Sequence, residues 1–395
     1  MTEFLDQAII GVGVAAVLVT IPALAELLLV TSGAFRPRSR SAKVPRDGFR
    51  LAAVVPAHNE EVLVGGCVAS ILRSAKAGAA CDVVVVADNC TDDTAARASA
   101  AGARVLVRED TQRRGKGYAL RFAFDQLMDD GFDAFLIVDA DSTVSINLLQ
   151  EIASTLSSGA DAVQARYRVA GPLDALRTRL VDVALLAFNV LRPRGRDGWG
   201  LSAGITGNGF ALSRRTLCDV PYTAESIVED LEYHLLLAGQ GKKVCFADRA
   251  TVYGVMPEGR EAQSSQRARW EGGRLRVARE WVPKLVTQLR RGRLAAAEPI
   301  LELLTLPLAY LALLALVLCI LPYPFFRWYG TAVLATLLIH VLSAAAVGGT
   351  FLKSFLSLIS APFYIAWKTT TLLAVVRSSG RKTEWVRTQR KTGAI

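Results

Sequence analysis

Short apolar runs alternate with stretches of helical character along the chain after about residue 49. The runs are rich in Val, Ile and Leu, which is typical of strands buried on both faces. We predict strands over Leu51 to Val55, Asp82 to Ala87, Arg104 to Val107, Phe135 to Val138 and Asp161 to Arg168. Strands that alternate with helices predict an α/β fold with a mainly parallel sheet and right-handed crossovers.

Much longer apolar runs lie outside this region. One extends from Ala8 to Thr31, and two more extend from about Pro299 to Leu321 and from about Trp328 to Val347. Each is about long enough to cross a bilayer as a helix. We therefore expect a transmembrane helix within residues 1–35 and a transmembrane hairpin within residues 298–349.

The composition agrees with a protein that lies partly in a bilayer. Hydrophobic residues make up 52% of the chain, and the mean hydropathy of +0.31 exceeds the usual soluble range. Leu173 to Leu191 is a helical stretch, and the basic, Gly-rich Arg192 to Gly200 is expected to be a loop at the membrane face. Residues 258–297 mix basic and apolar side chains, as interfacial helices do.

The distribution of charge predicts the orientation of these segments. Basic residues follow the first apolar run within a linker at residues 36–48, whereas the residues ahead of that run are acidic. The positive-inside rule then places the amino terminus outside and the α/β domain after Arg36 in the cytosol of a multi-pass cell-membrane protein. The basic tail, residues 377–395, is also expected in the cytosol. Residues 350–376 should therefore lie in the interface or re-enter, giving three crossings, with four as the alternative.

Other compositional features exclude several classes of protein. The net charge of +10 is concentrated at predicted membrane edges, which disfavours a nucleic-acid-binding protein. The six cysteines form no Cys-x-x-Cys pair, so we expect free thiols in a reducing compartment. Only three histidines occur, far apart, which makes a histidine-rich zinc site improbable.

Two carboxylates, Asp139 and Asp141, come directly after the strand at Phe135 to Val138. Ligands of open α/β sheets collect at the carboxyl ends of the strands. Two hard oxygen ligands there can hold Mg²⁺ or Mn²⁺ and leave the remaining coordination positions to a diphosphate. The alternative is a solvated turn that follows the strand.

Four motifs in order resemble those of the family 2 glycosyltransferases: Pro56 to Glu61, Asp88 to Thr94, Gly115 to Leu120, and Asp139 to Asp141. The resemblance implies a GT-A domain, with a mixed and mainly parallel sheet, over residues 49–257. A further segment, Gln266-Arg267-Ala268-Arg269-Trp270, matches the Gln-x-x-Arg-Trp signature of membrane-embedded members such as cellulose, hyaluronan and poly-N-acetylglucosamine synthases.

The resemblance also implies roles for individual residues. Asp230 would be the general base, and Glu229 would orient it or contact the acceptor; the alternative is that both cap a helix, since acidic residues favour a first turn. Gly207 and Asn208 would lie beside the acceptor sugar, or form a plain turn. The expected contacts of the donor nucleotide are Pro56, His58, Glu60 and Asp88.

Basic and aromatic side chains complete the expected site. Arg269 can form paired hydrogen bonds to diphosphate oxygens, and Lys116 supplies further positive charge. Trp270 offers a flat apolar face for a donor or acceptor pyranose, and Gln266 belongs to the same donor-binding segment. The alternative for this segment is an amphipathic helix with a packed Trp.

Together these features predict an inverting, metal-dependent glycosyltransferase of the membrane. A nucleotide-sugar, with UDP as the commonest expectation, would donate its sugar to a lipid-linked or membrane-presented acceptor to form a β-glycosidic bond in polysaccharide or glycolipid synthesis. One alternative is a processive synthase acting on a growing glycan, with an oligomer or a partner subunit completing the channel. The alternative of another class is an inactive membrane scaffold or glycan-binding relative.

Overall fold

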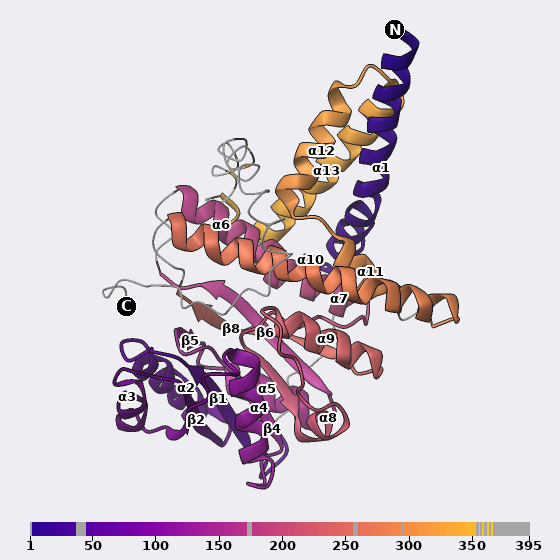
Figure 1. Ribbon diagram of the computed structural model, residues 1–395. Helices are drawn as coiled ribbons and strands as arrows, with labels where there is room; N and C mark the ends of the chain where they lie inside the picture. The colour runs from indigo at the N-terminus through magenta and orange to yellow at the C-terminus, as the bar shows by residue number, and fades with distance from the viewer. Residues whose placement is uncertain are drawn as a thin grey trace. The chain divides into compact units, whose positions relative to one another are not determined.

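The computed structural model describes residues 2–36, 45–171, 176–255, 260–293 and 296–352, with residues 355, 358, 362 and 365 (Figure 1). The chain divides into two compact units, which we describe separately. The sheet unit comprises the described residues within 37–172 and 200–274, and the helical unit comprises those within 1–36, 173–199 and 275–377.

The sheet unit is built on one eight-stranded sheet of order β3-β2-β1-β4-β7-β6-β8-β5. The strands are β1 (Leu51–Ala57), β2 (Cys81–Asp88), β3 (Arg104–Arg108), β4 (Ala134–Ile137), β5 (Ser142–Val144), β6 (Ala162–Val169), β7 (Phe210–Ser213) and β8 (Val244–Gly254). The first four strands in this order are parallel, β7 is antiparallel to β4 and β6, and β8 is parallel to β6 and antiparallel to β5. The predicted mixed, mainly parallel sheet is therefore confirmed.

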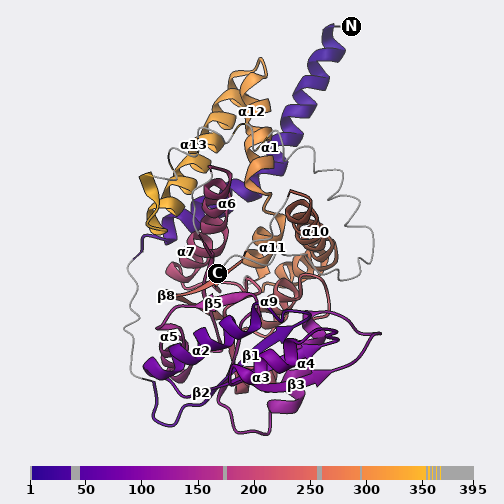
Figure 2. The same cartoon turned by 90° about the vertical axis from the view of Figure 1, so that its left-hand side faces the viewer.

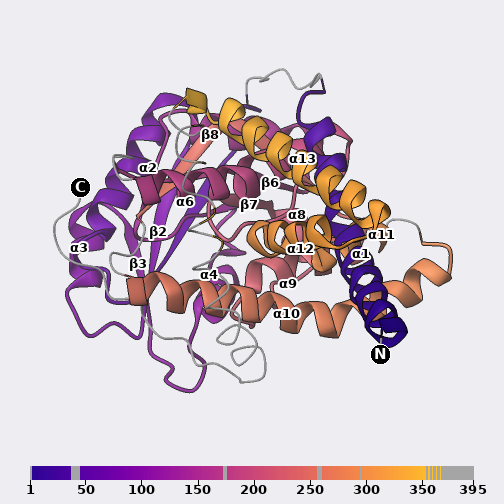
Figure 3. The ribbon, with the colours of Figure 1, turned by 90° about the horizontal axis from the view of Figure 1, so that it is seen from above.

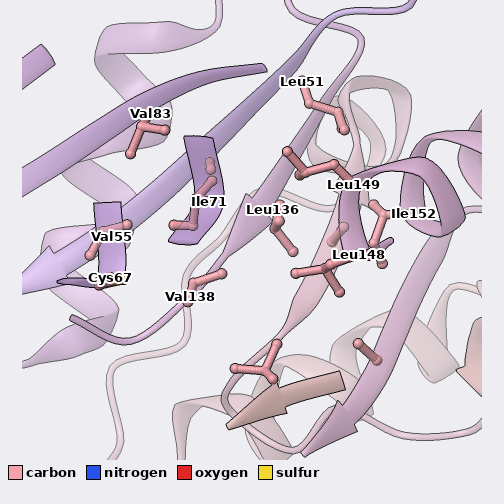
Figure 4. Close-up of a cluster of buried hydrophobic side chains, with 14 of the residues drawn as sticks. Leu51, Val55, Cys67, Ile71, Val83, Leu136, Val138, Leu148, Leu149 and Ile152 are labelled. Atoms are coloured by element: carbon pink, nitrogen blue, oxygen red, sulfur yellow. The ribbon is translucent and has the colours of Figure 1, made fainter. Parts of the chain in front are cut away.

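Helices cover both faces of the parallel strands. Alternate residues of β1, β2 and β4 pack against α2 (Val64–Gly78) and α5 (Leu148–Ser157). Figure 4 shows Leu136 of β4 in one cluster with Ile71 of α2 and Ile152 of α5. Helix α4 (Lys116–Leu127) covers the opposite face (Figures 2 and 3). There Phe124 packs edge-on against Phe135, with ring centroids 5.6 Å apart. The shorter helices of the unit are α3 (Thr94–Ala100), α8 (Arg214–Asp219) and α9 (Glu229–Gly239).

The helical unit contains α1 (Thr2–Gly33), α6 (Leu176–Leu186), the π-helical turn η1 (Ala187–Leu191), α7 (Arg192–Gly198), α11 (Ala297–Leu304), α12 (Leu308–Ile320) and α13 (Pro324–Val347). Helices α1, α12 and α13 lie side by side, joined by an apolar cluster that includes Leu27, Leu311 and Val333 (Figures 1 and 2). The long helix α10 (Arg260–Arg290) begins in the sheet unit and ends in the helical unit.

Among the described residues, two helices are long and apolar enough to cross a membrane, over Glu3–Gly33 and Pro324–Val347. The predicted span from Pro299 to Leu321 is not one continuous helix. It is broken into α11 and α12, which meet at 76°. Pro307 precedes α12 and lacks the N–H that a continuous helix would need, which explains the break. Most of residues 350–376 and the whole tail, residues 377–395, lie outside the described part of the chain.

The predicted loop from Arg192 to Gly200 is also wrong, because most of it is helix α7. Its glycines serve close packing. A Cβ on Gly195 would overlap the Val30 carbonyl group of α1, and a Cβ on Gly198 would overlap the backbone of Gly33. Pro193 is the second residue of α7, directly after the π-helical turn η1.

A cluster of buried charges joins three helices of this unit. Glu26 of α1 is fully buried and accepts from Arg196 at 2.7 Å and from Arg192 at 3.1 Å. Arg196 also donates to Glu302 of α11 at 2.7 Å. Buried charges are stable only when they are paired. This Glu26 cluster therefore fixes α7 and α11 against α1.

Candidate active site

The polar residues that follow β1, β2 and β4 stand at the carboxyl ends of adjacent parallel strands. His58 follows β1, Asp88 ends β2, and Asp139 and Asp141 follow β4. This is the edge at which α/β sheets bind ligands. The predicted strand at Phe135 to Val138 is completely buried, as its unbroken apolar sequence indicates.

Asp88 lies at the centre of one group of polar side chains. Its Oδ1 accepts from Arg108 at 2.6 Å and from Asn89 at 3.0 Å, and its carbonyl oxygen lies 2.8 Å from Nδ1 of His58. Burial raises the pKa of Asp88, while the positive charges of Arg108 and His58 oppose that shift. Asn89 adopts a left-handed conformation with φ of 51°, which lets its side chain turn back to Asp110.

Lys116 lies at the centre of a second group. It is the first residue of α4, and its Nζ donates to Asp139 Oδ1 at 2.5 Å and to the carbonyl oxygen of Gly207. Burial acts to lower the pKa of Lys116, but the carboxylates of Asp139, Glu229 and Asp230 raise it above its ordinary value. The lysine is thus held charged among carboxylates from two separate segments, the turn after β4 and the start of α9.

The glycine-rich segment after Ile205 runs between these carboxylates. Gly207 has φ of +78°, and a Cβ there would lie 3.0 Å from Asp230 Oδ2. Glycine therefore lets the backbone approach the Asp230 carboxylate. Asn208 is buried; its Oδ1 accepts from the Asp139 N–H at 3.1 Å and its Nδ2 donates to Ser142 at 2.8 Å. The Asn208 side chain thus holds the turn that carries the two aspartates.

Glu229 and Asp230 begin α9, and no side chain caps this helix. Burial raises the pKa of Glu229 to about 8, despite the opposing charge of Lys116. Burial also raises the pKa of Asp230, while the N–H of Leu231 and the charge of Lys116 act to lower it. A helix terminus alone would not require a buried carboxylate beside a partly buried one, whereas groups that exchange protons commonly occupy such sites.

Asp139 and Asp141 are the residues that could hold a divalent cation. In the described ranges, no group of three or more His, Cys, Asp or Glu side chains is placed to bind a metal ion. The two aspartates still fit Mg²⁺ or Mn²⁺, because both are hard oxygen donors and Asp139 keeps a third of its side chain exposed. A nucleotide diphosphate and water would then supply the remaining ligands.

The Gln-x-x-Arg-Trp segment lies within α10. Gln266 and Arg269 are partly exposed, and Trp270 is 42% exposed. Burial lowers the pKa of the Arg269 guanidinium. A Cβ on Gly273 would lie 3.0 Å from Val228, the residue before Glu229. This part of α10 therefore passes beside the start of α9.

The structure places most of the predicted residues around Asp88 or around Lys116. It also adds one residue to the site that the sequence did not indicate. Pro56 lies within β1, and the backbone N–H of Glu60 donates to Thr94 at 2.7 Å. The new residue is Arg108, which ends β3 and contacts Asp88. Its position after a short apolar run, next to the other strand ends, is the signal that could have identified it.

Residues 47–273 match the sequence model of a protein family described as "Glycosyltransferase like family 2". The chain is 24% identical over 254 residues to the probable glycosyltransferase YdaM of Bacillus subtilis. The matched region covers 62% of this chain and 60% of the length of that relative. Its fold is similar to that of the mannosyltransferase PcManGT from Pyrobaculum calidifontis, solved in complex with GDP-Man and Mn²⁺. That likeness has a TM-score of 0.53 at 18% identity and covers 94% of this chain and all of the other.

Proposed function

Because the chain belongs to the family 2 glycosyltransferases, we propose that it moves a sugar from a nucleotide-sugar to a lipid-linked or membrane-presented acceptor. The reaction is metal-dependent and inverting, and it forms a β-glycosidic bond. The observation that carries the proposal is the position of Lys116, which binds Asp139 and Gly207 and whose charge interacts with Glu229 and Asp230.

The donor is assigned to the strand ends. Asp139 and Asp141 would hold Mg²⁺ or Mn²⁺, which when bound neutralises part of the diphosphate charge. Asp88 takes the nucleoside together with Pro56, His58 and Glu60, which lie at or just after the end of the neighbouring strand β1. UDP-sugars remain the first expectation, and the GDP-Man complex of the similar mannosyltransferase supports the inclusion of GDP-sugars in any test.

Asp230 acts as the general base. It takes the proton of an acceptor hydroxyl as that oxygen attacks the anomeric carbon of the donor. Its position beside Gly207 supports this role, because the absence of a side chain there lets the predicted acceptor segment approach the Asp230 carboxylate. Glu229 orients Asp230 or contacts the acceptor. A single displacement inverts the anomeric centre, so an α-linked donor gives a β-linked product.

The departing nucleoside diphosphate needs positive charge. Lys116 is already charged within the carboxylate group, and Arg269 donates paired hydrogen bonds to the diphosphate. Gln266 belongs to the same donor-binding segment. The exposed face of Trp270 packs against a pyranose ring of the donor or acceptor. The free-energy cost of burying the Lys116 and Arg269 cations is thus offset by their attraction to the negative charge that develops on the leaving diphosphate.

The acceptor is assigned to the membrane. The apolar helices over Glu3–Gly33 and Pro324–Val347 would anchor the chain, with α11 and α12 as a broken third span and the domain at residues 49–257 in the cytosol. This arrangement gives three crossings, with residues 350–376 in the interface. So few spans favour addition of one or a few sugars to a lipid over extrusion of a long polymer.

A donor screen tests this function. The full-length protein in detergent is incubated with UDP- and GDP-sugars and a polyprenyl-phosphate or glycolipid acceptor, with and without Mn²⁺, and release of nucleoside diphosphate is measured. We expect Mn²⁺-dependent release that Asp230→Asn abolishes and that Asp125→Asn, on the exposed face of α4, leaves unchanged. Equal release by the Asp230→Asn variant would exclude Asp230 as the base, and long products on a gel would identify a processive enzyme.

A further inference from the structure

Arg108 is an unusually placed arginine. It is the last residue of β3 and is paired in register with Asp88, the last residue of β2. Only 8% of it is exposed to solvent. Arginine is rarely buried to this extent unless its guanidinium is paired. The arrangement therefore needs an explanation beyond the packing of a strand end.

The guanidinium of Arg108 is committed to three partners. Its Nη1 donates to Asp88 Oδ1 at 2.6 Å, and its Nη2 donates to Asp110 at 3.0 Å and to the carbonyl oxygen of Arg113 at 2.8 Å. The ring of Tyr118 lies 6.0 Å from its central carbon. Since these hydrogen bonds all go to groups of the protein, and both N–H groups of Nη2 are used, Arg108 serves to hold other groups in place.

The contacts to Asp88 orient its carboxylate. Arg108 and Asn89 both donate to Oδ1. In the part of the chain that the structure describes, the hydrogen bonds to this carboxylate end on that one oxygen, so Oδ2 is left to accept from a ligand. The positive charge of Arg108 also opposes the effect of burial, which raises the pKa of Asp88.

The same guanidinium fixes the segment at residues 109–115. Asp110 Oδ1 accepts from the N–H groups of Gln112 and Arg113, both at 3.0 Å, while Arg108 binds the other oxygen of Asp110. The side chain of Asn89 adds bonds to the N–H and carbonyl groups of Asp110. This segment leads directly into Lys116, so one side chain links the Asp88 carboxylate to the start of α4.

We propose that Arg108 is a positioning residue for the nucleoside end of the donor site. It holds Asp88 and residues 109–115 in the one arrangement that accepts the nucleoside, and it thereby sets the affinity for the donor. The proposal rests on the function proposed above, in which Asp88 contacts the nucleoside. It assigns Arg108 no part in the diphosphate or in the chemical step.

Two substitutions separate charge from geometry. Lysine at this position keeps one positive charge for Asp88, but an ammonium group cannot reach all three acceptors in the fixed geometry of a guanidinium. Methionine removes the charge and leaves Asp88 buried without it. Arg104→Met is the matched control, since Arg104 lies on the same strand and pairs with Asp130 at the exposed surface.

The experiment compares the affinity for a nucleotide with that for pyrophosphate. Using the donor that wild type accepts, we measure KM and kcat for Arg108→Lys, Arg108→Met and Arg104→Met, and inhibition by the matching nucleoside diphosphate and by pyrophosphate with Mn²⁺. We expect the donor KM and the nucleoside diphosphate Ki to rise about tenfold or more in both Arg108 variants, as when a charged hydrogen bond is lost. The kcat and the pyrophosphate Ki should change less than about threefold, because only uniform donor binding is lost.

The outcomes distinguish three situations. A thermally stable Arg108→Lys protein with wild-type donor KM refutes the role of Arg108, even if Arg108→Met fails to fold. An equal rise in the pyrophosphate Ki, or in the KM of Arg104→Met, refutes it as well, because the effect would then be general. A wild-type protein that binds no nucleoside diphosphate refutes the proposed function, and with it this role.

Discussion

Substitution of Gly195 by alanine should destabilise the helical unit strongly. A Cβ at this position would lie 2.6 Å from both the carbonyl carbon and the Cα of Val30, in addition to overlapping its oxygen. Carbon atoms in contact are normally about 3.5–4.0 Å apart. Helix α7 would have to move away from α1 by roughly 1 Å to admit the methyl group.

That movement would act on the Glu26 cluster. Arg196 and Arg192 bind Glu26 at 2.7 and 3.1 Å, so a shift of this size breaks both hydrogen bonds within a buried site. Overpacking alone costs about 1–3 kcal/mol, and breaking a buried ion pair costs about 3–5 kcal/mol. We therefore expect the melting temperature to fall by at least about 5 °C, since each kcal/mol corresponds to about 2–4 °C in a unit of this size.

Thermal unfolding in detergent, followed by tryptophan fluorescence, measures the effect. Gly11→Ala is the matched control, because Gly11 lies on α1 in the same unit and a Cβ there would meet no atom within 4 Å. Alanine in a helix is favoured over glycine by about 1 kcal/mol, so the control should be neutral or slightly stabilising. A Gly195→Ala protein as stable as Gly11→Ala would refute the close approach of α7 to α1.

Three further predictions concern the active site. Asp230→Asn should lower kcat by about 10²–10⁴-fold with donor affinity nearly unchanged, and a large loss of donor binding in calorimetry would contradict its assignment as the base. Asp141→Ala should weaken Mn²⁺-dependent binding of the donor, which titration of Mn²⁺ at fixed nucleoside diphosphate detects; the same Mn²⁺ dependence as wild type would remove it from the metal site. The folded-state pKa of Glu229, about 8, lies above its unfolded value, so its contribution to stability is complete below about pH 4.5 and is lost as the pH rises through 8. Glu229→Gln should therefore gain roughly 3–5 kcal/mol relative to wild type between pH 5 and pH 9 in chemical denaturation, and a constant difference would show that the carboxylate is not buried.

The sequence predicted the parallel half of the sheet well, since β1, β2 and β4 are runs of apolar residues long enough to be recognised alone. Strands β5, β7 and β8 were not predicted. Strand β7 has only four residues and gains its stability from β4 and β6 on either side, which no local pattern reveals. Within β8, Asp248 interrupts the apolar pattern because it pairs with Arg166 of the neighbouring strand.

The error at α7 has a similar origin. Glycine and basic residues are typical of loops, but here the glycines permit contact with α1 and the arginines bind Glu26. In the site, the types of residue were evident from the motifs, whereas the bond between Lys116 and Asp139 was not. Arg108 escaped notice because an arginine at the end of a strand is usually solvated, and only the fold shows that this one is buried.

The Glu26 cluster also constrains how the protein is made. Arg196 is synthesised 170 residues after Glu26, and Glu302 follows 106 residues after Arg196. At about 5–20 residues per second, the first helix waits roughly 10–30 s for a guanidinium to reach it. In the proposed membrane topology, the Glu26 carboxylate without its guanidinium partner is costly to place in lipid during that interval, so α1 would settle in the membrane only as the later helices emerge from the ribosome. A chain truncated before α7 would consequently leave a poorly anchored first helix, open to quality-control proteases.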